Sequence, residues 1–308
     1  MSRQLLRMEP VFLEKIWGGD RLHTVFDYEI PCDTTGECWA ISGHPGGEST
    51  VAGTGKTLAQ LWKEQPELFG NLPGELFPLL VKIIDAREDL SIQVHPDDSY
   101  AAAHEENSLG KTECWYVLDC DEGTNIIIGH NAKTREEMAQ MVAEGRWNEL
   151  LREIPIRKGD FFQINPGCLH AIKGGTMILE TQQSSDMTYR FYDYGRLQDG
   201  KPRELHIEKS LDVTTAPFVP AAPEQTVTLV GDAQVTHLVT CPYYSVYRCE
   251  LKGRAEFHWD QPFVNVSILA GSGTLDGIPV RKGDHLLIPA GYGDMTVEGE
   301  LEWIYSHL

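Results

Sequence analysis

The sequence carries little positive charge. Its 308 residues include 26 Lys and Arg against 46 Asp and Glu, which gives a formal net charge of −20 at pH 7. Nucleic acids and anionic membrane surfaces are bound through an excess of positive charge, so neither is expected as a partner. A small anionic ligand would need a local basic pocket that acts against the field of the whole protein.

Cysteines and long apolar runs are also scarce. The seven cysteines are odd in number and never occur as CxxC, which argues against a disulfide framework and predicts reduced thiols. The N-terminal segment has no apolar core of signal-peptide length, and no later run is long enough to span a bilayer. We therefore expect a cytoplasmic protein without membrane contact. Nothing in the composition specifies an oligomeric state.

A phosphate-binding loop is missing as well, although one stretch imitates its end. Gly53-Thr54-Gly55-Lys56-Thr57 has the final GK[ST] letters, but the first glycine of the motif should stand at position 50, which is Thr50. No apolar strand leads into the stretch. The pattern instead predicts a turn followed by Thr57 as the cap of a helix.

What the chain does contain is a succession of short strand-like segments with turns between them. Many short strands with few helices are typical of β-sandwiches and β-barrels. Helices are predicted after Thr57, after Asp97 or Asp98 to near Gly110, from Thr134 to Gly145, from Trp147 to before Pro155, and at 204–212. Strands are predicted at 77–85, 90–95, 111–118, 124–129, 160–165, 168–173, 176–183 and 187–193, with a later hairpin turn at Asp276-Gly277.

An internal repeat indicates the fold class. The residues 155–160, PIRKGD, recur at 279–284 as PVRKGD, and each copy precedes an apolar strand and a turn. This pattern is similar to the second sequence motif of the cupins, whose barrels are closed jelly rolls. The first copy continues to His170, where the cupin pattern places a metal ligand, whereas the second has no histidine there.

The repeat therefore predicts a mainly β protein with two jelly-roll (cupin) β-barrels and a small helical insertion. We expect a metal-binding catalytic cupin domain with helical insertions over residues 1–215. A degenerate second cupin domain without metal ligands is expected over residues 216–308. The proline-rich stretch 214–223 is the best candidate for a linker.

Candidate metal ligands gather around the strand predicted at 90–95. Its two-residue period puts Ser91, Gln93 and His95 on one face, opposite an apolar face. His95, Glu113 and His170 could supply two imidazole nitrogens and a carboxylate, which are recognised ligands for a catalytic metal with open positions. Gln93 could add a carbonyl oxygen. The alternative for any histidine is an ordinary hydrogen-bonded group, and that interpretation is assigned to His23, His104, His206, His258 and His307.

Basic residues accompany the same segments. Lys82 is the one charge in a buried apolar run, Lys111 shares a strand face with Glu113, and Arg190 lies on a later predicted strand. Each of these could be an exposed charge. Together they would form an anion site beside the metal, and the planar guanidinium of Arg190 suits a phosphate or a developing oxyanion.

Five stretches of the sequence carry a family resemblance. They are Trp17-Gly18-Gly19, Ser91-Ile92-Gln93-Val94-His95-Pro96, Gly110-Lys111-Thr112-Glu113, Pro166-Gly167-Cys168-Leu169-His170 and Glu180-Thr181-Gln182-Gln183-Ser184-Ser185-Asp186 through Arg190. Together they resemble the type I mannose-6-phosphate isomerases (phosphomannose isomerases), in their short bacterial form. The interval between the Lys-x-Glu strand and the final histidine is shorter than in the longer members of that family.

The resemblance implies an enzyme with one Zn²⁺ per chain that interconverts mannose 6-phosphate and fructose 6-phosphate through a cis-enediolate. It implies Arg190 as the catalytic arginine. It also implies a sugar-phosphate pocket lined by Ser91, Lys82 and Lys111. The zinc ligands that it implies are Gln93, His95, Glu113 and His170.

Two other functions share parts of this pattern. A non-haem iron cupin oxygenase uses the same two histidines and carboxylate, and a non-catalytic phosphosugar-binding cupin would use the same basic residues. The basic cluster and Gln93 favour a phosphosugar and zinc. The sequence leaves the proton-transferring base open between a metal-bound water and a carboxylate of the pocket.

Overall fold

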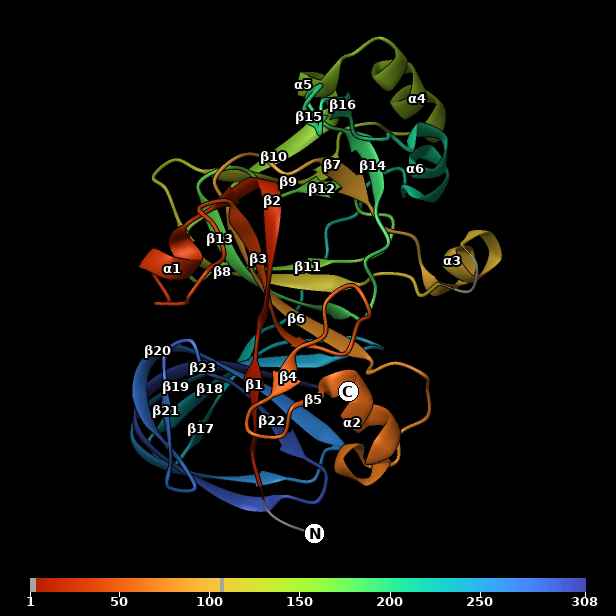
Figure 1. Cartoon of the computed structure of the whole chain (residues 1–308). Coiled ribbons are helices and arrows are strands. Elements are labelled where there is room, and N and C mark those ends of the chain that lie inside the picture. Colours follow the sequence, from red (N-terminus) through yellow and green to blue (C-terminus); the bar gives the residue numbers. More distant parts are fainter. Residues whose placement is uncertain (1–3, 106–107) are drawn as a thin grey trace.

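The N-terminal half consists of two antiparallel sheets packed face to face (Figure 1). The computed structural model describes residues 4–105 and 108–308. One sheet has six strands in the order β11-β8-β13-β6-β2-β3, and the other has five in the order β10-β9-β12-β7-β14. The strands are β2 (Val11–Gly19), β3 (Thr35–Ser42), β6 (Leu79–Ala86), β7 (Ile92–Val94), β8 (Glu113–Cys120), β9 (Asn125–His130), β10 (Leu151–Pro155), β11 (Phe161–Ile164), β12 (His170–Ala171), β13 (Thr176–Gln183) and β14 (Tyr189–Tyr192).

A buried apolar cluster fills the space between these two sheets. Ile84 of β6 and Trp115 of β8 come from the six-stranded sheet, and Ile126 and Ile128 of β9 come from the five-stranded sheet. Two facing sheets of this kind make a jelly roll, so the predicted fold class is confirmed. Among the described residues, no strand pairing joins the two sheets into the closed cylinder that the cupin pattern suggested.

The C-terminal half is one ten-stranded sheet that curls into the lower body in Figure 1. Its order is β17-β18-β19-β23-β20-β22-β1-β4-β5, with β21 paired to β20. Its strands are β1 (Leu6–Glu9), β4 (Thr50–Val51), β5 (Lys56–Thr57), β17 (Thr226–Val230), β18 (Ala233–Thr240), β19 (Ser245–Trp259), β20 (Phe263–Leu275), β21 (Ile278–Arg281), β22 (His285–Pro289) and β23 (Gly293–His307).

Three strands of this second sheet come from the beginning of the chain. β1 pairs antiparallel with β22, with Leu6 opposite Leu287, and β4 and β5 extend the sheet beyond β1. Figure 1 shows the chain entering at the bottom, passing through β1 in the lower half and continuing upward into the upper half. The domain boundary between residues 215 and 216 remains a prediction. The segment before it contributes β1, β4 and β5 to the sheet of the second half.

The sequence repeat forms the same turn twice. Gly159 and Gly283 have φ angles of +91° and +89°, a region that favours glycine. The Asp160 carboxylate accepts from the Arg157 backbone N–H at 2.9 Å, and the Asp284 carboxylate accepts from that of Arg281 at 2.8 Å. Each turn delivers the chain into a buried strand, β11 in one half and β22 in the other.

Most predicted helices form, and two end earlier than expected. Thr57 caps α2 through the Gln60 N–H, which confirms the turn-and-cap interpretation. The helix expected to reach Gly110 ends at His104, and residues 106–107 lie outside the described part. The helix expected to include Leu151 ends at Leu150, because Leu151 pairs with His130 of β9 instead. The helices are α1 (Arg21–Thr24), α2 (Leu58–Glu64), η1 (Pro66–Phe69), α3 (Asp98–His104), α4 (Arg135–Ala143), α5 (Trp147–Leu150) and α6 (Ile207–Val213).

The predicted linker at 214–223 contains no helix or strand, and the hairpin turn at Asp276-Gly277 joins β20 to β21 with both residues at positive φ. A second hairpin pairs β15 (Leu197–Gln198) with β16 (Lys201–Pro202). None of the helices in residues 4–105 and 108–308 combines the length and the apolar character that crossing a membrane requires.

An aromatic cluster joins the two halves. Phe77 precedes β6 of the upper half, and its ring centroid lies 4.7 Å from that of Phe263 at the start of β20. Trp62 of α2 and Phe69 of η1 complete the cluster, with 5.1 Å between their ring centroids. All four side chains are buried. This contact supplies apolar burial across the junction of the two halves.

Replacing Phe263 with Ala should therefore destabilise the protein by about 3–5 kcal/mol, because it leaves a cavity among rings that cannot close over it. Equilibrium urea unfolding followed by tryptophan fluorescence measures this loss. The control is Leu229→Ala, since the Leu229 side chain is 78% exposed. A free energy of unfolding for Phe263→Ala equal to that of the control would contradict this account of the junction.

Candidate active site

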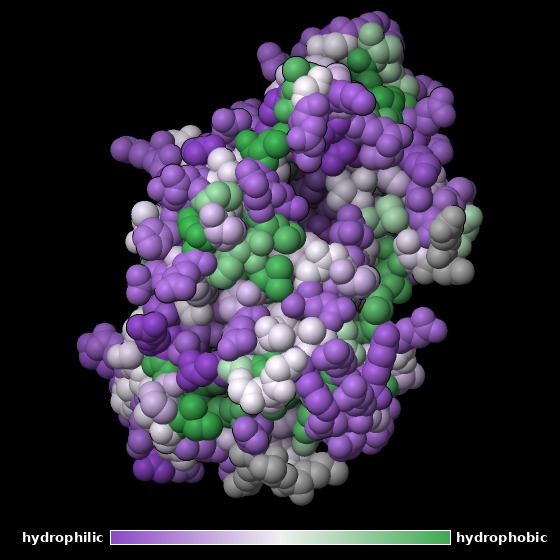
Figure 2. Space-filling view, viewed as in Figure 1, coloured by the Kyte–Doolittle hydropathy of each residue, from purple (hydrophilic) through white to green (hydrophobic). Residues whose placement is uncertain are grey.

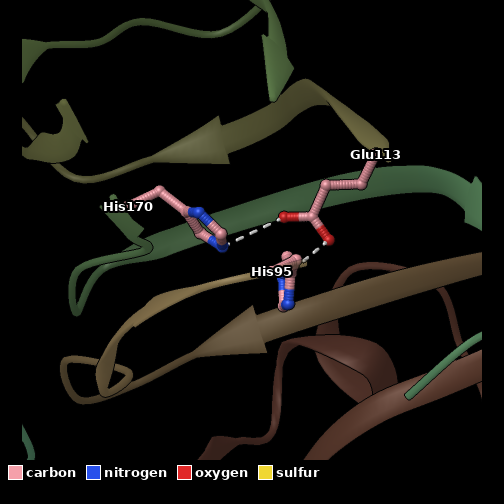
Figure 3. Close-up of side chains that lie close together, drawn as sticks. All are labelled: His95, Glu113 and His170. Atoms are coloured by element: carbon pink, nitrogen blue, oxygen red, sulfur yellow. Dashed lines mark ion pairs between the residues drawn. The ribbon is translucent and has the colours of Figure 1, made fainter. Parts of the chain in front are cut away.

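The predicted metal ligands come from both sheets of the N-terminal half. His95 directly follows β7, and His170 begins the neighbouring strand β12, where it pairs with Gln93. Glu113 begins β8 in the facing sheet, opposite Gln182 of β13. The three side chains therefore meet in the space between the sheets (Figure 3).

The geometry of these three side chains is close. The Nε2 of His95 lies 3.5 Å from Oε2 of Glu113, and the Nε2 of His170 lies 3.3 Å from Oε1. At most 1% of each side chain is exposed. The structure thus brings together the two imidazoles and the carboxylate that the sequence singled out.

Backbone carbonyls fix the orientation of both imidazoles. The Nδ1–H of His95 donates to the carbonyl oxygen of Met187 at 2.7 Å, and that of His170 donates to the carbonyl oxygen of Cys168 at 2.9 Å. Each ring then presents the lone pair of Nε2 toward Glu113. This is the arrangement in which histidine binds a metal, since the second ring nitrogen is held by a hydrogen bond.

The donor set fits a metal ion. One ligand atom from each of His95, Glu113 and His170 can be chosen so that all lie within 4.8 Å of one another. Both Glu113 oxygens are buried without a well-formed hydrogen bond from the described residues, although buried polar atoms normally have a partner. Two nitrogens and one carboxylate leave positions open for a substrate.

Gln93 lies beside these three residues, with its side-chain amide nitrogen toward His170. Its Nε2 is 3.3 Å from Nε2 of His170, while its Oε1 accepts from the Ser91 hydroxyl at 3.5 Å. The oxygen and nitrogen of a side-chain amide are nearly identical in shape, so which position holds which atom is assigned from the surrounding hydrogen-bond partners. Turning the amide by half a turn would present Oε1 as a fourth ligand.

Lys111 gives Glu113 its counter-charge. The Nζ of Lys111 lies 2.5 Å from Oε2 of Glu113 and 3.4 Å from Nε2 of His95. Burial by itself would raise the pKa of Glu113, but the charge of Lys111 outweighs burial and holds the pKa well below its usual range. Burial also lowers the pKa of His170.

A cavity of about 340 Å³ opens beside the candidate ligands. Figure 2 shows a hollow with mainly hydrophilic surroundings in the upper half of the molecule. Every predicted residue of the substrate pocket lines the cavity, and so does Gln93. The pocket residues that the structure brings together here are Ser91, Lys82, Lys111 and Arg190.

Glu180 is a cavity residue that our sequence reasoning did not assign. Its Oε1 lies 3.6 Å from Nζ of Lys82 and 3.7 Å from Nζ of Lys111, and its Oε2 accepts from the Trp115 indole at 3.0 Å. Burial and the charge of Glu113 raise its pKa. A signal was present, because Glu180 stands in a stretch that carries the family resemblance and alternates with Gln182 along β13.

Arg190 lies farther along the cavity wall, on β14. One of its guanidinium N–H groups donates to the carbonyl oxygen of Glu204 at 3.0 Å, and its Nε is buried without a hydrogen-bond partner among the described residues. Arg203, which also lines the cavity, is held by two hydrogen bonds to Asp193 at 2.6 and 2.7 Å. No sequence pattern pointed to Arg203, because it stands outside any regular strand.

The jelly-roll fold and this donor set define a cupin with a candidate metal centre beside a basic cavity. Comparisons with known proteins give its family. Residues 5–122 match the catalytic domain of type I phosphomannose isomerase, and residues 234–308 match the cupin domain of mannose-6-phosphate isomerase. The chain belongs to the type I phosphomannose isomerase family, which confirms the resemblance found in the sequence, and it is therefore an enzyme of the isomerase class.

Relatives extend over the whole chain. It is 48% identical over 310 residues to the probable mannose-6-phosphate isomerase GmuF of Bacillus subtilis, covering 98% of each chain. It is 49% identical to the mannose-6-phosphate isomerase of Streptococcus mutans, over 97% of this chain and 98% of that one. The crystal structure of the mannose 6-phosphate isomerase from Bacillus subtilis matches with a TM-score of 0.97 at 46% identity, covering 99% of each chain.

A more distant likeness concerns the fold alone. The Salmonella typhimurium phosphomannose isomerases match with TM-scores near 0.8, for example 0.78 for the apo form at 14% identity, over 100% of this chain and 99% of that one. A mannose 6-phosphate isomerase bound with zinc and yttrium matches with a TM-score of 0.78 at 14% identity, over 98% of this chain and 99% of that one. The two-half architecture is thus retained where the sequence has diverged widely.

Acid should destabilise the metal-free protein through His95. Burial, with the charge of Lys111, lowers the pKa of His95 to about 3, whereas an unfolded chain protonates histidine near its ordinary pKa of about 6.5. Between these values the unfolded state binds the additional proton, so the free energy of unfolding falls as the pH falls through this window. Urea unfolding of the chelated protein at several pH values measures the slope.

The matched variants for this experiment are His95→Asn, which should make the slope shallower, and His258→Asn, which makes the same substitution at an exposed histidine. An identical slope for His95→Asn and the unmodified protein would show that His95 is not held neutral by burial.

Proposed function

We propose that the chain is a zinc-dependent mannose-6-phosphate isomerase that binds one Zn²⁺ through Gln93, His95, Glu113 and His170. The observation that carries the proposal is the meeting of two oriented imidazoles with a buried carboxylate at a cavity lined by cationic side chains. Two imidazole nitrogens with a carboxylate are a donor set that suits zinc, and one fold neighbour is a mannose 6-phosphate isomerase bound with zinc and yttrium. The proposed catalytic domain covers residues 1–215.

The reaction that this site would perform moves a proton between C1 and C2 of the open-chain sugar through a cis-enediolate. When bound, zinc supplies a Lewis acid for the sugar oxygens. Lys111 stands beside the ligand set, so its ammonium group would stabilise the negative charge that develops on those oxygens. Arg190 would add a second positive charge from the cavity wall.

Ser91 and Lys82 are assigned to binding the substrate. Both are buried side chains at the cavity surface, and the ammonium group of Lys82 also lies over the Trp39 ring at 4.7 Å. A lysine held in this way presents a fixed positive charge, which suits a phosphorylated sugar in an otherwise acidic protein.

Glu180 is our candidate for the base. It is a buried carboxylate at the cavity, and burial together with the charge of Glu113 raises its pKa. A carboxylate with a raised pKa transfers protons efficiently near neutral pH. Lys82 and Lys111 flank it, so it can remain ionised before it takes the proton.

Removal of the metal tests this function directly. A coupled assay that follows fructose 6-phosphate formation from mannose 6-phosphate should lose its signal after chelation and regain it with Zn²⁺. His170→Ala should lose both bound zinc and activity, while His258→Ala, at an exposed position, should retain both. Stoichiometric zinc in His170→Ala would disprove the ligand assignment.

The outcomes of that assay also separate the alternatives. Iron-dependent oxygen consumption without isomerase activity would indicate an oxygenase, and phosphosugar binding without turnover would indicate a binding protein. Either result would overturn the proposal.

Substitution of Glu180 and Arg190 separates the base from the charge donor. Glu180→Gln keeps the hydrogen-bonding shape but removes the base, so kcat should fall by about 10²–10⁴-fold with zinc retained. Arg190→Ala should also retain zinc, with kcat lower by roughly 10²-fold. Steady-state kinetics combined with metal analysis checks both. Unchanged kcat values would remove the residue concerned from the mechanism.

A further inference from the structure

One loop of the second half reaches the candidate active site. Residues 241–244 connect β18 to β19, and they place two consecutive tyrosines against the first half. The hydroxyl of Tyr243 donates to Oδ2 of Asp98 at 2.8 Å, and Tyr244 is hydrogen-bonded to Gln163 at 3.2 Å. Gln163 of β11 pairs with Cys114, the residue after Glu113. The second half therefore contacts β11, which pairs with the strand that begins with a proposed zinc ligand.

Asp98, the first residue of α3, accepts hydrogen bonds from three separate segments. Besides the Tyr243 hydroxyl, the backbone N–H of Gly110 donates to Oδ1 at 2.8 Å, and the side-chain amide of Gln183 donates to the same oxygen at 3.1 Å. The backbone of Gly110 lies so close to that of Asp97 that a Cβ at position 110 would be 2.4 Å from the backbone carbonyl carbon of Asp97. The carboxylate thus fastens the loop that leads into Lys111.

The same network continues past Lys111. The side-chain oxygen of Gln183 accepts from the backbone N–H of Thr112 at 2.8 Å, and the backbone N–H of Lys111 donates to the carbonyl oxygen of Pro96 at 3.1 Å. Three successive backbone N–H groups, at 110, 111 and 112, are therefore tied to fixed partners. Pro96 follows His95 directly, so the network links the backbone beside one ligand with the backbone beside another.

We propose that Tyr243 and Asp98 are positioning residues, and that the second half completes the active site by holding the backbone of residues 110–112 in place. The proposal rests on the zinc site proposed above. Lys111 and Glu113 stand on either side of Thr112, so a shift of this backbone moves the counter-charge and a ligand together. Hydrogen bonds behind metal ligands typically change metal affinity or activity by 10–100-fold when they are lost.

This role explains why the network ends in a charged acceptor. A carboxylate accepts several short hydrogen bonds at once and binds each more strongly than a neutral oxygen does. Because both oxygens of Asp98 are engaged, removing the Tyr243 hydroxyl leaves a partly buried charge with one partner fewer. The second half then loses its direct hold on the loop, although the aromatic junction at Phe263 remains.

The test compares Tyr243→Phe with Tyr292→Phe in the full-length protein. The hydroxyl of Tyr292 also donates to an aspartate, Asp276, at 2.8 Å in the same half, but next to the β20–β21 hairpin. Each variant therefore loses one hydrogen bond from a tyrosine to an aspartate, but only Tyr243→Phe loses it at Asp98, which binds the backbone N–H of Gly110. Competition with a chromophoric chelator measures the zinc dissociation constant, and hydrogen exchange by mass spectrometry measures protection of the amides at 110–112.

Tyr243→Phe should weaken zinc binding by about 10-fold and speed exchange of these amides, while Tyr292→Phe leaves both at the level of the unmodified protein. Asp98→Asn should have at least the effect of Tyr243→Phe, and the double variant should be no worse than Asp98→Asn, because both act through one network. A loss of thermal stability in Tyr243→Phe with unchanged zinc affinity and exchange would overturn the proposal.

Both readouts are independent of catalysis. If the unmodified protein binds zinc but does not turn over mannose 6-phosphate, the proposed function fails while the effect of Tyr243→Phe on zinc and exchange still stands. If turnover is normal and Tyr243→Phe changes neither readout, the positioning role alone is wrong.

Discussion

The buried carboxylate of Glu113 is the constraint on which the rest of the site depends. None of its side chain is exposed, and a charge removed from water in this way is costly unless opposite charge and hydrogen-bond donors surround it. Lys111 supplies the opposite charge at 2.5 Å. The two imidazoles supply further polar atoms, and their backbone hydrogen bonds leave a lone pair, not a proton, facing the carboxylate. Two imidazole lone pairs turned toward a carboxylate leave acceptor atoms facing one another, and this is the electrostatic reason to expect a metal ion among them in addition to Lys111.

The jelly roll makes this cluster possible by bringing two sheets face to face. Glu113 and Glu180 belong to the six-stranded sheet, while His95, His170 and Arg190 belong to or adjoin the five-stranded sheet. Alternation along the strands turns these polar groups into the space between the sheets, where they lie beside the apolar cluster that contains Ile84 and Trp115. The cationic side chains at the cavity then create a local positive region in a protein whose net charge is −20. An anionic sugar phosphate can therefore bind against the overall field.

Local patterns in the sequence were enough to predict the fold class and most of the site. The repeat around Gly159 and Gly283 predicted two similar β units because a Gly-Asp turn depends on neighbouring residues alone. The alternation of Ser91, Gln93 and His95 likewise identified one polar strand face.

Features that depend on distant partners were not predictable in this way. The contribution of β1 to the second sheet, the contact between Tyr243 and Asp98, and the place of Glu180 between two lysines all join segments far apart in the chain. The helix predicted to continue through Leu151 ends at Leu150 for the same reason, because the pairing of Leu151 with β9 overrides the local helical pattern. Sequence periodicity indicates which face of a strand or helix a residue occupies, whereas the segments packed against that face are determined by the fold.

Anomalous diffraction at the zinc absorption edge, from crystals of the protein grown with equimolar Zn²⁺, tests the proposed metal site most directly. One strong peak per chain is expected, at about 2.0–2.2 Å from Nε2 of His95, Nε2 of His170 and the Glu113 carboxylate. A peak at any other place, or none between the two sheets, would contradict the proposed site.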